Sequence, residues 1–324
     1  MLSRRTLHCT ALATAALLAA PAALAQAAYP AKPITIVVGY PAGGSTDLTG
    51  RTLGEALSKQ LGVPVVIDNV GGAGGTIGAQ KVANAAPDGY TLLVGANNEL
   101  AIAKLVTRNV KYSPADFTPI GLIAAQPMVL VASTGTGVKN AAEFVKRVKA
   151  NPGKYSYGSS GVGTALHLAG EMAKEQAGLF MTHIPYRGVG PLTNDLIGNN
   201  LDFGVFVLSS GLPHIKAGKV VALGVTSAQR AAGAPDIPAL AELPALKNMD
   251  IESWFALVGP AGMPPPVVDR LKKALDAALA SPEFRQKMAA AGATVAAPDA
   301  KLPKFWAEEV AKYQKIVKFA KIEQ

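Results

Sequence analysis

Apolar and polar positions follow two alternating patterns along the first hundred residues. Residues 34–39 form an apolar run in which Thr35 is the one polar residue, a pattern typical of a parallel strand buried on both faces. Residues 47–61 carry leucines at helical spacing and predict an amphipathic helix. The same alternation continues, so the next expected elements are strand 65–67, helix 76–86 and strand 90–94. This order indicates a βαβαβ unit with right-handed crossovers.

The alternation starts again in the second half of the chain. Residues 120–133 hold two apolar runs separated by Gln126-Pro127, and because proline cannot donate to a ladder we expect a strand boundary there, with passage to a second lobe. The elements expected in this lobe are helix 141–150, strand 155–157, helix 165–177, strand 181–185, helix 191–198 and strands 201–208 and 220–226. After an irregular return over 231–248, the chain predicts strand 254–259 and helices 264–279, 282–291 and 302–319, which we expect to pack on the first lobe.

The N-terminus has the order of an export signal. Arg4 and Arg5 precede an apolar run over residues 11–24, which is too short for a stop-transfer helix, and small residues around 23–27 fit a cleavage site between Ala25 and Ala27. The two arginines also fit a twin-arginine signal, and the alternative is an ordinary secretory head. We therefore expect a periplasmic protein whose residues 1–27 are removed, which leaves 324 − 27 = 297 residues.

Composition and charge exclude several classes of function. The formal net charge of +9 falls to +7 without Arg4 and Arg5, a balance that can steer anionic ligands or simply solvate a basic surface. The lysines are scattered and aromatic residues make up only 6%, so we expect no nucleic-acid partner. Cys9, the only cysteine, lies in the signal, which excludes cysteine nucleophiles and thiolate metal sites from the mature chain.

Three glycine turns are candidates for ligand binding. The first, residues 40–47, ends a strand and opens a helix that Ser45 or Thr46 can cap, so its amides suit a carboxylate or a phosphate. The second, residues 71–75, has neither the dinucleotide fingerprint nor a P-loop, and it remains a backbone approach to a ligand or a flexible loop. The third, residues 158–164, lacks the glycine spacing of a nucleophile elbow and offers hydroxyls at a helix start.

Other side chains allow weaker hypotheses. His167 and Glu171, four residues apart, can form one edge of a metal site, but no third ligand follows, so we expect no metal and no cofactor. Arg187 follows a strand end and can clamp a carboxylate, or it is a surface arginine. Trp254 can stack on a ligand, but packing between lobes is the simpler interpretation.

These motifs, in this order, resemble one family. The resemblance covers residues 29–322, and the segments that carry it are 29–34, 41–51, 72–79, 87–93, 157–164, 167–171, 183–188, 217–219, 225–227 and 260–262. The chain resembles the Bug-type receptors of tripartite tricarboxylate transporters. That resemblance implies the α/β fold of a type II periplasmic binding protein, with two doubly wound lobes joined by a hinge and a ligand cleft between them. We place lobe 1 at residues 28–125 plus 251–324 and lobe 2 at 126–250.

The resemblance also implies where the ligand binds. Loops that match residues 40–47 and 72–75 receive a carboxylate in this family, and the turn matching 159–164 and the region of Arg187 close over it. The residues expected to bind ligand are Tyr40, Pro41, Ala42, Gly43, Gly44, Ser45, Asp47, Gly72, Ala73, Gly74, Asn97, Ser159, Ser160, Gly161, Thr164, His167 and Arg187. No catalytic residue is expected.

The chain departs from the family pattern at two places. Val70-Gly71 stand where members usually have Arg-Pro, which removes a basic side chain from the expected cleft. Asn97-Asn98-Glu99-Leu100 stand where many members have a histidine, and Glu99 would disfavour a second carboxylate if it faced the cleft. These departures bear on which carboxylate binds.

The sequence thus predicts a monomeric periplasmic receptor for a small organic carboxylate, with membrane permease subunits as partners. Lobe closure around the ligand shifts an open–closed equilibrium. Two alternatives stay open: an exported serine hydrolase that uses Ser160 and His167, and a ligand sensor for a two-component histidine kinase.

Overall fold

The computed structural model describes residues 29–298 and 301–322. The chain divides into two units, Met1–Ala31 and Lys32–Gln324, and all elements below belong to the second unit. The expected signal peptide, with its Arg4-Arg5 head and its cleavage site, lies outside the described residues. In the part of the chain that the structure describes, no helix is long and apolar enough to cross a membrane.

The first part of the chain forms the expected alternation. Its helices and strands are β1 (Ile34–Val38), α2 (Ser45–Leu61), β2 (Val65–Asn69), η1 (Ala73–Gly75), α3 (Thr76–Ala83), β3 (Thr91–Ala96), η2 (Asn98–Ile102), α4 (Ala103–Val106) and η3 (Pro114–Asp116). Ile36, Val37 and Val38 of β1 are fully buried, as the apolar run predicts. Helix α3 ends at Ala83, earlier than residue 86, because Pro87 disfavours helical geometry in the residue before it.

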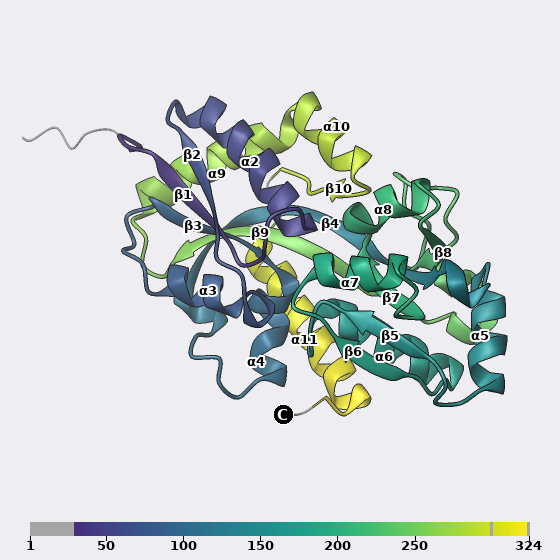
Figure 1. The fold of residues 1–324 in the computed structure, drawn as a ribbon. Helices are drawn as coiled ribbons and strands as arrows, with labels where there is room; N and C mark the ends of the chain where they lie inside the picture. The colour runs from purple at the N-terminus through teal and green to yellow at the C-terminus, as the bar shows by residue number, and fades with distance from the viewer. Residues whose placement is uncertain (1–28, 299–300, 323–324) are drawn as a thin grey trace, which may run out of the picture. The chain divides into compact units, whose positions relative to one another are not determined.

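The second part repeats the alternation and then returns. Its elements are β4 (Phe117–Ser133), η4 (Thr134–Thr136), α5 (Ala141–Ala150), β5 (Ser156–Ser159), α6 (Ala165–Ala177), β6 (Thr182–Pro185), α7 (Val189–Ile197), β7 (Phe203–Val207), α8 (Leu208–Lys216), β8 (Val220–Val225), η5 (Leu240–Glu242), η6 (Pro244–Leu246), β9 (Glu252–Pro260), α9 (Pro265–Ala280), α10 (Pro282–Ala290), β10 (Thr294–Val295) and α11 (Leu302–Ala320). Helices cover the sheet, with α2, α9 and α10 grouped near β1 and β2 (Figure 1).

The described strands form one mixed sheet in the order β2-β1-β3-β9-β4-β7-β5-β6, with β8 and β10 also paired to β4. The pairs β1–β2, β1–β3, β5–β6 and β5–β7 are parallel, as βαβ units require, whereas β9 runs antiparallel to both β3 and β4. Each half of the chain therefore supplies its own set of parallel strands, and the long strand β4 connects them.

The expectation that a strand ends at Gln126-Pro127 is wrong, because β4 is continuous from Phe117 to Ser133. Strand β4 runs through this point, but its partner changes: Pro127 is the last residue in register with β9, and Met128 is the first in register with β7. The missing N–H of Pro127 therefore falls where the ladder passes from one partner to the next. Nearby, the Thr226 hydroxyl donates to the carbonyl of Ile251 (2.6 Å) and accepts from the amide of Met128 (3.0 Å), which ties the connecting segments together.

The C-terminal helices return as expected, with one addition. Helices α9 and α10 contact α2, in the first half of the chain. Helix α11 contacts η2 and α4 of the first half and also α6 of the second half. Trp254 of β9 packs against this helix, donating from Nε1 to Glu309 (2.9 Å) and making an edge contact with Phe305, so it is a packing residue.

Candidate functional site

Two adjoining cavities lie where the parallel strands end, the usual position of ligands in α/β sheets. One, of about 390 Å³, reaches Met128 of β4, Val207 of β7 and Ser253 of β9, and we call it the strand cavity. The other, of about 520 Å³, is lined by residues 72–76 and 160–164, and we call it the loop cavity. The residues common to both are Tyr40, Pro41, Asn98, Ser160, Arg187 and Gly188.

The structure brings residues of all three glycine turns to these cavities. Of the residues expected to bind ligand, those lining the strand cavity are Tyr40, Pro41, Ala42, Gly43, Gly44, Ser45, Ser160 and Arg187. Those lining the loop cavity are Tyr40, Pro41, Gly72, Ala73, Gly74, Ser160, Gly161, Thr164 and Arg187. The remaining ones line neither cavity: Asp47, Asn97, Ser159 and His167. The second turn thus reaches only the loop cavity.

The first turn ends in a helix start that no side chain caps. The expectation that Ser45 or Thr46 caps helix α2 is wrong, because Gly44 is the N-cap and both hydroxyl residues lie inside the helix. Gly44 has no side chain to accept from the first amides of α2. These amides, at the positive end of the helix dipole, therefore face the strand cavity without a side-chain partner.

Asp47 supports this turn from behind. Its Oδ2 accepts from the Gly43 amide (2.9 Å) and from Arg51 Nε (3.0 Å), and its Oδ1 accepts from Asn69 Nδ2 (2.9 Å). Burial raises the pKa of Asp47, but the hydrogen bonds from Arg51, Gly43 and Asn69 outweigh it and hold the pKa below its ordinary value. The ionised carboxylate therefore fixes the turn that lines the strand cavity.

The second turn depends on close backbone approach. Gly72, Gly74 and Gly75 all have positive φ, which glycine adopts at little cost. A Cβ on Gly39, at the end of β1, would lie 2.7 Å from the Gly75 carbonyl oxygen, and a Cβ on Gly75 would lie 2.6 Å from Glu99 Oε2. The glycines therefore let the second turn pack directly against the end of β1.

The Tyr40 hydroxyl joins the first and second turns. It lies 2.8 Å from the Gly74 carbonyl oxygen and 2.7 Å from Glu99 Oε2, while Glu99 Oε1 accepts from the Ala96 amide (2.6 Å). Glu99 is 2% exposed and lines neither cavity, so it lies behind Tyr40. Burial raises the pKa of Glu99 to about 7, although hydrogen bonds from Ala96 and Tyr40 oppose this shift.

Asn97 is an anchor for helix α11. It is fully buried, and its Nδ2 donates to the Tyr313 hydroxyl (2.6 Å) and to the Glu252 carbonyl (3.1 Å). Its amide hydrogens are therefore used inside the protein. The neighbouring Asn98, which is not among the residues expected to bind ligand, lines both cavities.

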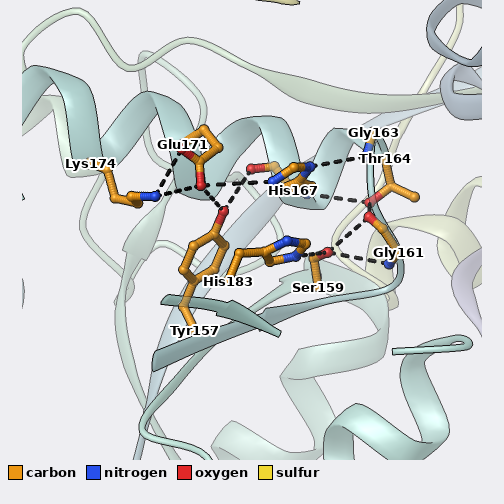
Figure 2. Close-up of polar contacts among 9 residues, drawn as sticks. All are labelled: Tyr157, Ser159, Gly161, Gly163, Thr164, His167, Glu171, Lys174 and His183. Atoms are coloured by element: carbon orange, nitrogen blue, oxygen red, sulfur yellow. Dashed lines mark hydrogen bonds and ion pairs between the residues drawn. The ribbon is translucent and has the colours of Figure 1, made fainter. Parts of the chain in front are cut away.

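The third turn is held by a pair of stacked histidines (Figure 2). The rings of His167 and His183 lie 3.8 Å apart at an interplanar angle of 13°. His167 Nδ1 accepts from the Gly163 amide (3.0 Å), and His183 Nε2 lies 2.7 Å from Ser159 Oγ. Ser159 Oγ in turn contacts the backbone of Gly161. The two rings therefore fix both ends of the turn that lines the cavities.

The histidine pair is neutral in the folded protein. Burial lowers the pKa of His167 to about 4, with Glu171 acting in the opposite direction. Burial and the neighbouring His167 lower the pKa of His183 to about 3. A neutral His167 is required for Nδ1 to accept the Gly163 hydrogen bond, so the pKa shifts and the geometry agree.

A carboxylate and a lysine complete this cluster. Glu171 Oε1 accepts from the Tyr157 hydroxyl (2.6 Å) and from Lys174 Nζ (2.7 Å). It lies 3.7 Å from His167 Nε2. Among the described residues, no group of three His, Cys, Asp or Glu side chains is placed to hold a metal ion.

The geometry does not form a serine nucleophile. Ser159, which contacts His183, is fully buried, so a substrate cannot reach its hydroxyl. Ser160 lines both cavities, but the structure gives it no hydrogen bond to His167, whose Nδ1 is occupied by Gly163. The Ser160–His167 pair considered from the sequence is therefore not assembled.

The electrostatics of both cavities favour an anion. The N-cap residues of helices α2 and α7 are Gly44 and Gly188, which have no side chain to cap the helix, and both helix starts line the strand cavity. Arg187 lines both cavities, and among the described residues it has no ion pair or hydrogen bond. In the described ranges, no Asp or Glu lines either cavity. Exposed amides and one cation thus face a space without negative charge.

Part of the lining of the strand cavity was not predicted from the sequence. Its polar residues include Asn98, Thr193, Asn194, Ser210, His214 and Ser253. They come from η2, α7, α8 and β9, which are distant in sequence, and only the polar Asn97-Asn98 pair after a predicted strand gave a local signal.

Comparisons with known proteins agree with this geometry. The family model described as "Tripartite tricarboxylate transporter family receptor" (TctC) matches residues 49–322. The solved structure of the periplasmic binding protein BugD is 38% identical, with 91% of this chain and 99% of that chain covered and a TM-score of 0.85.

Two further similar structures are described with bound ligands. Rpa4515 of R. palustris with adipate is 32% identical, with 90% of this chain and 98% of that chain covered and a TM-score of 0.86. MatC (Rpa3494) of Rhodopseudomonas palustris with bound malate is 29% identical, with 89% and 100% covered and a TM-score of 0.83.

The fold is that of an α/β periplasmic binding protein. The chain belongs to the TctC family, the receptors of tripartite tricarboxylate transporters. It is therefore a periplasmic solute receptor and not an enzyme, as the sequence predicts.

Proposed function

We propose that this receptor captures a small organic carboxylate in the strand and loop cavities and delivers it to the permease subunits of a tripartite tricarboxylate transporter. The observation that carries the proposal is the convergence of uncapped helix starts and Arg187 on cavities without acidic side chains. A carboxylate satisfies such amides and pairs with a guanidinium. Relatives with bound adipate and malate support the same ligand class.

Capture proceeds by closure of two lobes, residues 28–125 plus 251–324 and residues 126–250. The first and second turns belong to lobe 1, and the third turn and Arg187 belong to lobe 2, so a ligand that touches both favours the closed form. Strand β4, which changes partners at Pro127, and the return segment near Ile251 form the hinge. The closed monomer then presents one joint surface to the permease.

A ligand screen tests this function. Thermal shift and calorimetry are run with adipate, malate and citrate, and with adipamide as an uncharged match for adipate. Binding to the native state alone raises stability by about 2.7 kcal/mol at a hundredfold excess over the dissociation constant. We expect micromolar binding of at least one carboxylate and no shift with adipamide. Equal binding of the acid and the amide would contradict the proposal.

Export through residues 1–27 is the second part of the proposal. The protein is expressed in full length, and its periplasmic fraction is analysed by mass spectrometry. We expect a mature chain that starts after Ala25 or Ala27. Replacement of Arg4 and Arg5 by lysine separates the two routes, because only a twin-arginine signal depends strictly on both arginines.

A further inference from the structure

Asn98 lines both cavities, and its side chain forms hydrogen bonds with Tyr40 and with Ala165, which come from different halves of the chain. Its Oδ1 accepts from the backbone amide of Ala165 (2.6 Å), the first residue of helix α6. Its Nδ2 donates to the Tyr40 hydroxyl (2.8 Å), in the first turn. Tyr40 belongs to the proposed lobe 1 and Ala165 to the proposed lobe 2, so one side chain connects them.

The orientation of the Asn98 amide is determined by its partners. A backbone N–H can only donate, so the side-chain atom facing Ala165 must be Oδ1. Nδ2 then faces Tyr40, whose hydroxyl accepts from it. Rotation of the amide by 180° would place two donors against each other at Ala165. The contact with Ala165 therefore requires an acceptor oxygen, which fixes the Asn98 amide in this orientation.

Asn98 also completes the start of helix α6 from the opposite wall. Thr164, the N-cap of α6, accepts from the His167 amide, which leaves the Ala165 amide without a partner on its own helix. Asn98 supplies that acceptor. Ala165 is only 2% exposed, so loss of the contact would leave a buried donor unsatisfied in this conformation.

The surroundings hold Asn98 in place. It starts the π-helical turn η2, a rare geometry that is frequent at functional sites. Its partner Tyr40 is fixed by the Gly74 carbonyl and by Glu99. Because η2 contacts helix α11 as well, Asn98 projects from a rigid part of the first half.

We propose that Asn98 is a positioning residue that latches the two lobes directly and separates the strand cavity from the loop cavity. The inference rests on the lobe closure of the proposed function and names the residue that holds the closed form. Since the latch joins protein to protein, it forms without ligand. A bound carboxylate further stabilises a closed state that the protein already populates, and the latch slows release of the carboxylate.

The first test measures closure without ligand. The predicted mature chain has no cysteine, so Ala86→Cys and Lys149→Cys, both exposed and one in each proposed lobe, carry spin labels. We expect a compact population of label distances in the parent and a shift to longer distances in Asn98→Ala. Asn98→Asp keeps the acceptor for Ala165 and should retain the compact population, whereas a role limited to local structure would not be rescued by aspartate.

The second test measures ligand release. Stopped-flow kinetics with adipate and malate compare the parent with Asn98→Ala and with Asn84→Ala, an exposed asparagine at the end of α3. Only the hydrogen bond from the Ala165 amide to Asn98 Oδ1 crosses between the proposed lobes, so the loss of this one bond predicts release about 3- to 10-fold faster in Asn98→Ala with association within about threefold. Asn84→Ala should match the parent.

The outcomes separate this inference from the proposed function. Unchanged label distances in Asn98→Ala, or an unchanged release rate, would overturn the latch. If neither acid binds the parent, the proposed ligand class fails, and the ligand-free distances still decide the latch. If Asn98→Ala does not fold, as judged by circular dichroism, an Asn98→Asp variant with the parent's label distances supports the latch and one with longer distances overturns it.

Discussion

Glu99→Gln is the substitution whose effect the structure predicts most fully. The Glu99 carboxyl is buried between the Tyr40 hydroxyl and the Ala96 amide. When Glu99 is protonated, it donates to Tyr40, and the Tyr40 hydroxyl is free to donate to the Gly74 carbonyl at 2.8 Å. When Glu99 ionises, its Oε2 accepts the hydrogen bond of the Tyr40 hydroxyl, and the Gly74 carbonyl loses that donor. Glutamine at position 99 would imitate the protonated form, with Nε2 donating to Tyr40.

The magnitude follows from the pKa of Glu99. Burial raises this pKa from 4.5 to about 7 in the folded protein, so the folded state binds a proton more tightly than the unfolded state. The stabilisation is complete below the unfolded value and is lost as the pH rises through the folded value. The full difference is worth about 3 kcal/mol, of which about 2.5 kcal/mol is lost between roughly pH 5 and pH 8.

Urea denaturation followed by circular dichroism measures this effect at pH 5, 6, 7 and 8. The free energy of unfolding of Glu99→Gln, relative to the parent, should rise by about 2.5 kcal/mol across the series. Other titrating groups are common to both proteins and cancel in the difference. Glu308→Gln, an exposed glutamate on α11, controls for the loss of one negative charge. Parallel curves for the parent and Glu99→Gln would refute the reasoning.

Three further predictions test the other parts of the site. His183→Gln removes one of the two histidines whose low pKa makes the folded protein less stable in acid. In urea titrations, the free energy of unfolding of the variant should therefore fall less than that of the parent between roughly pH 6.5 and pH 4. An equal fall in the two proteins would contradict this prediction. Asp47→Ala leaves the Gly43 amide without its acceptor and should cost about 2–4 kcal/mol of stability and weaken carboxylate binding, measured by calorimetry; unchanged affinity would remove Asp47 from any role in ordering the turn. Arg187→Ala should weaken adipate or malate binding about 10- to 100-fold in the same calorimeter with little change in melting temperature, and full affinity would exclude Arg187 from the site.

Local patterns in the sequence predicted most of the fold. The apolar run of β1 and the glycine turns are local signals, and the structure has the strands, turns and helices that they indicate. Two errors have local causes too. A hydroxyl residue often caps a helix, but at α2 the preceding residue, Gly44, is the N-cap. A proline usually ends a strand, but Pro127 stands at the point where β4 changes its pairing partner, so the strand continues.

The supporting residues of the site could not be predicted in the same way. Ser159 and His183 are 24 positions apart, and Asn98 and Ala165 are 67 apart, so only the three-dimensional arrangement shows that they touch. Asn97 and Asn98 are adjacent and chemically identical, yet one anchors helix α11 and the other faces the cavities. Their difference comes from the direction in which η2 turns the chain, which composition and spacing do not specify.

The register at Pro127 has a consequence for how the receptor is built. Pro127 lies opposite Glu252, and the Ile251 amide donates to the Thr226 carbonyl. The chain therefore leaves the first part of the sheet at Pro127 and returns to it at Glu252, at the same place. The stretch between these points is topologically an insertion with adjacent ends. The inserted stretch and the rest of the chain can thus each rearrange without one passing through the other. The buried Thr226 hydroxyl couples the two parts, because it forms hydrogen bonds with both connecting segments, at Ile251 and at Met128.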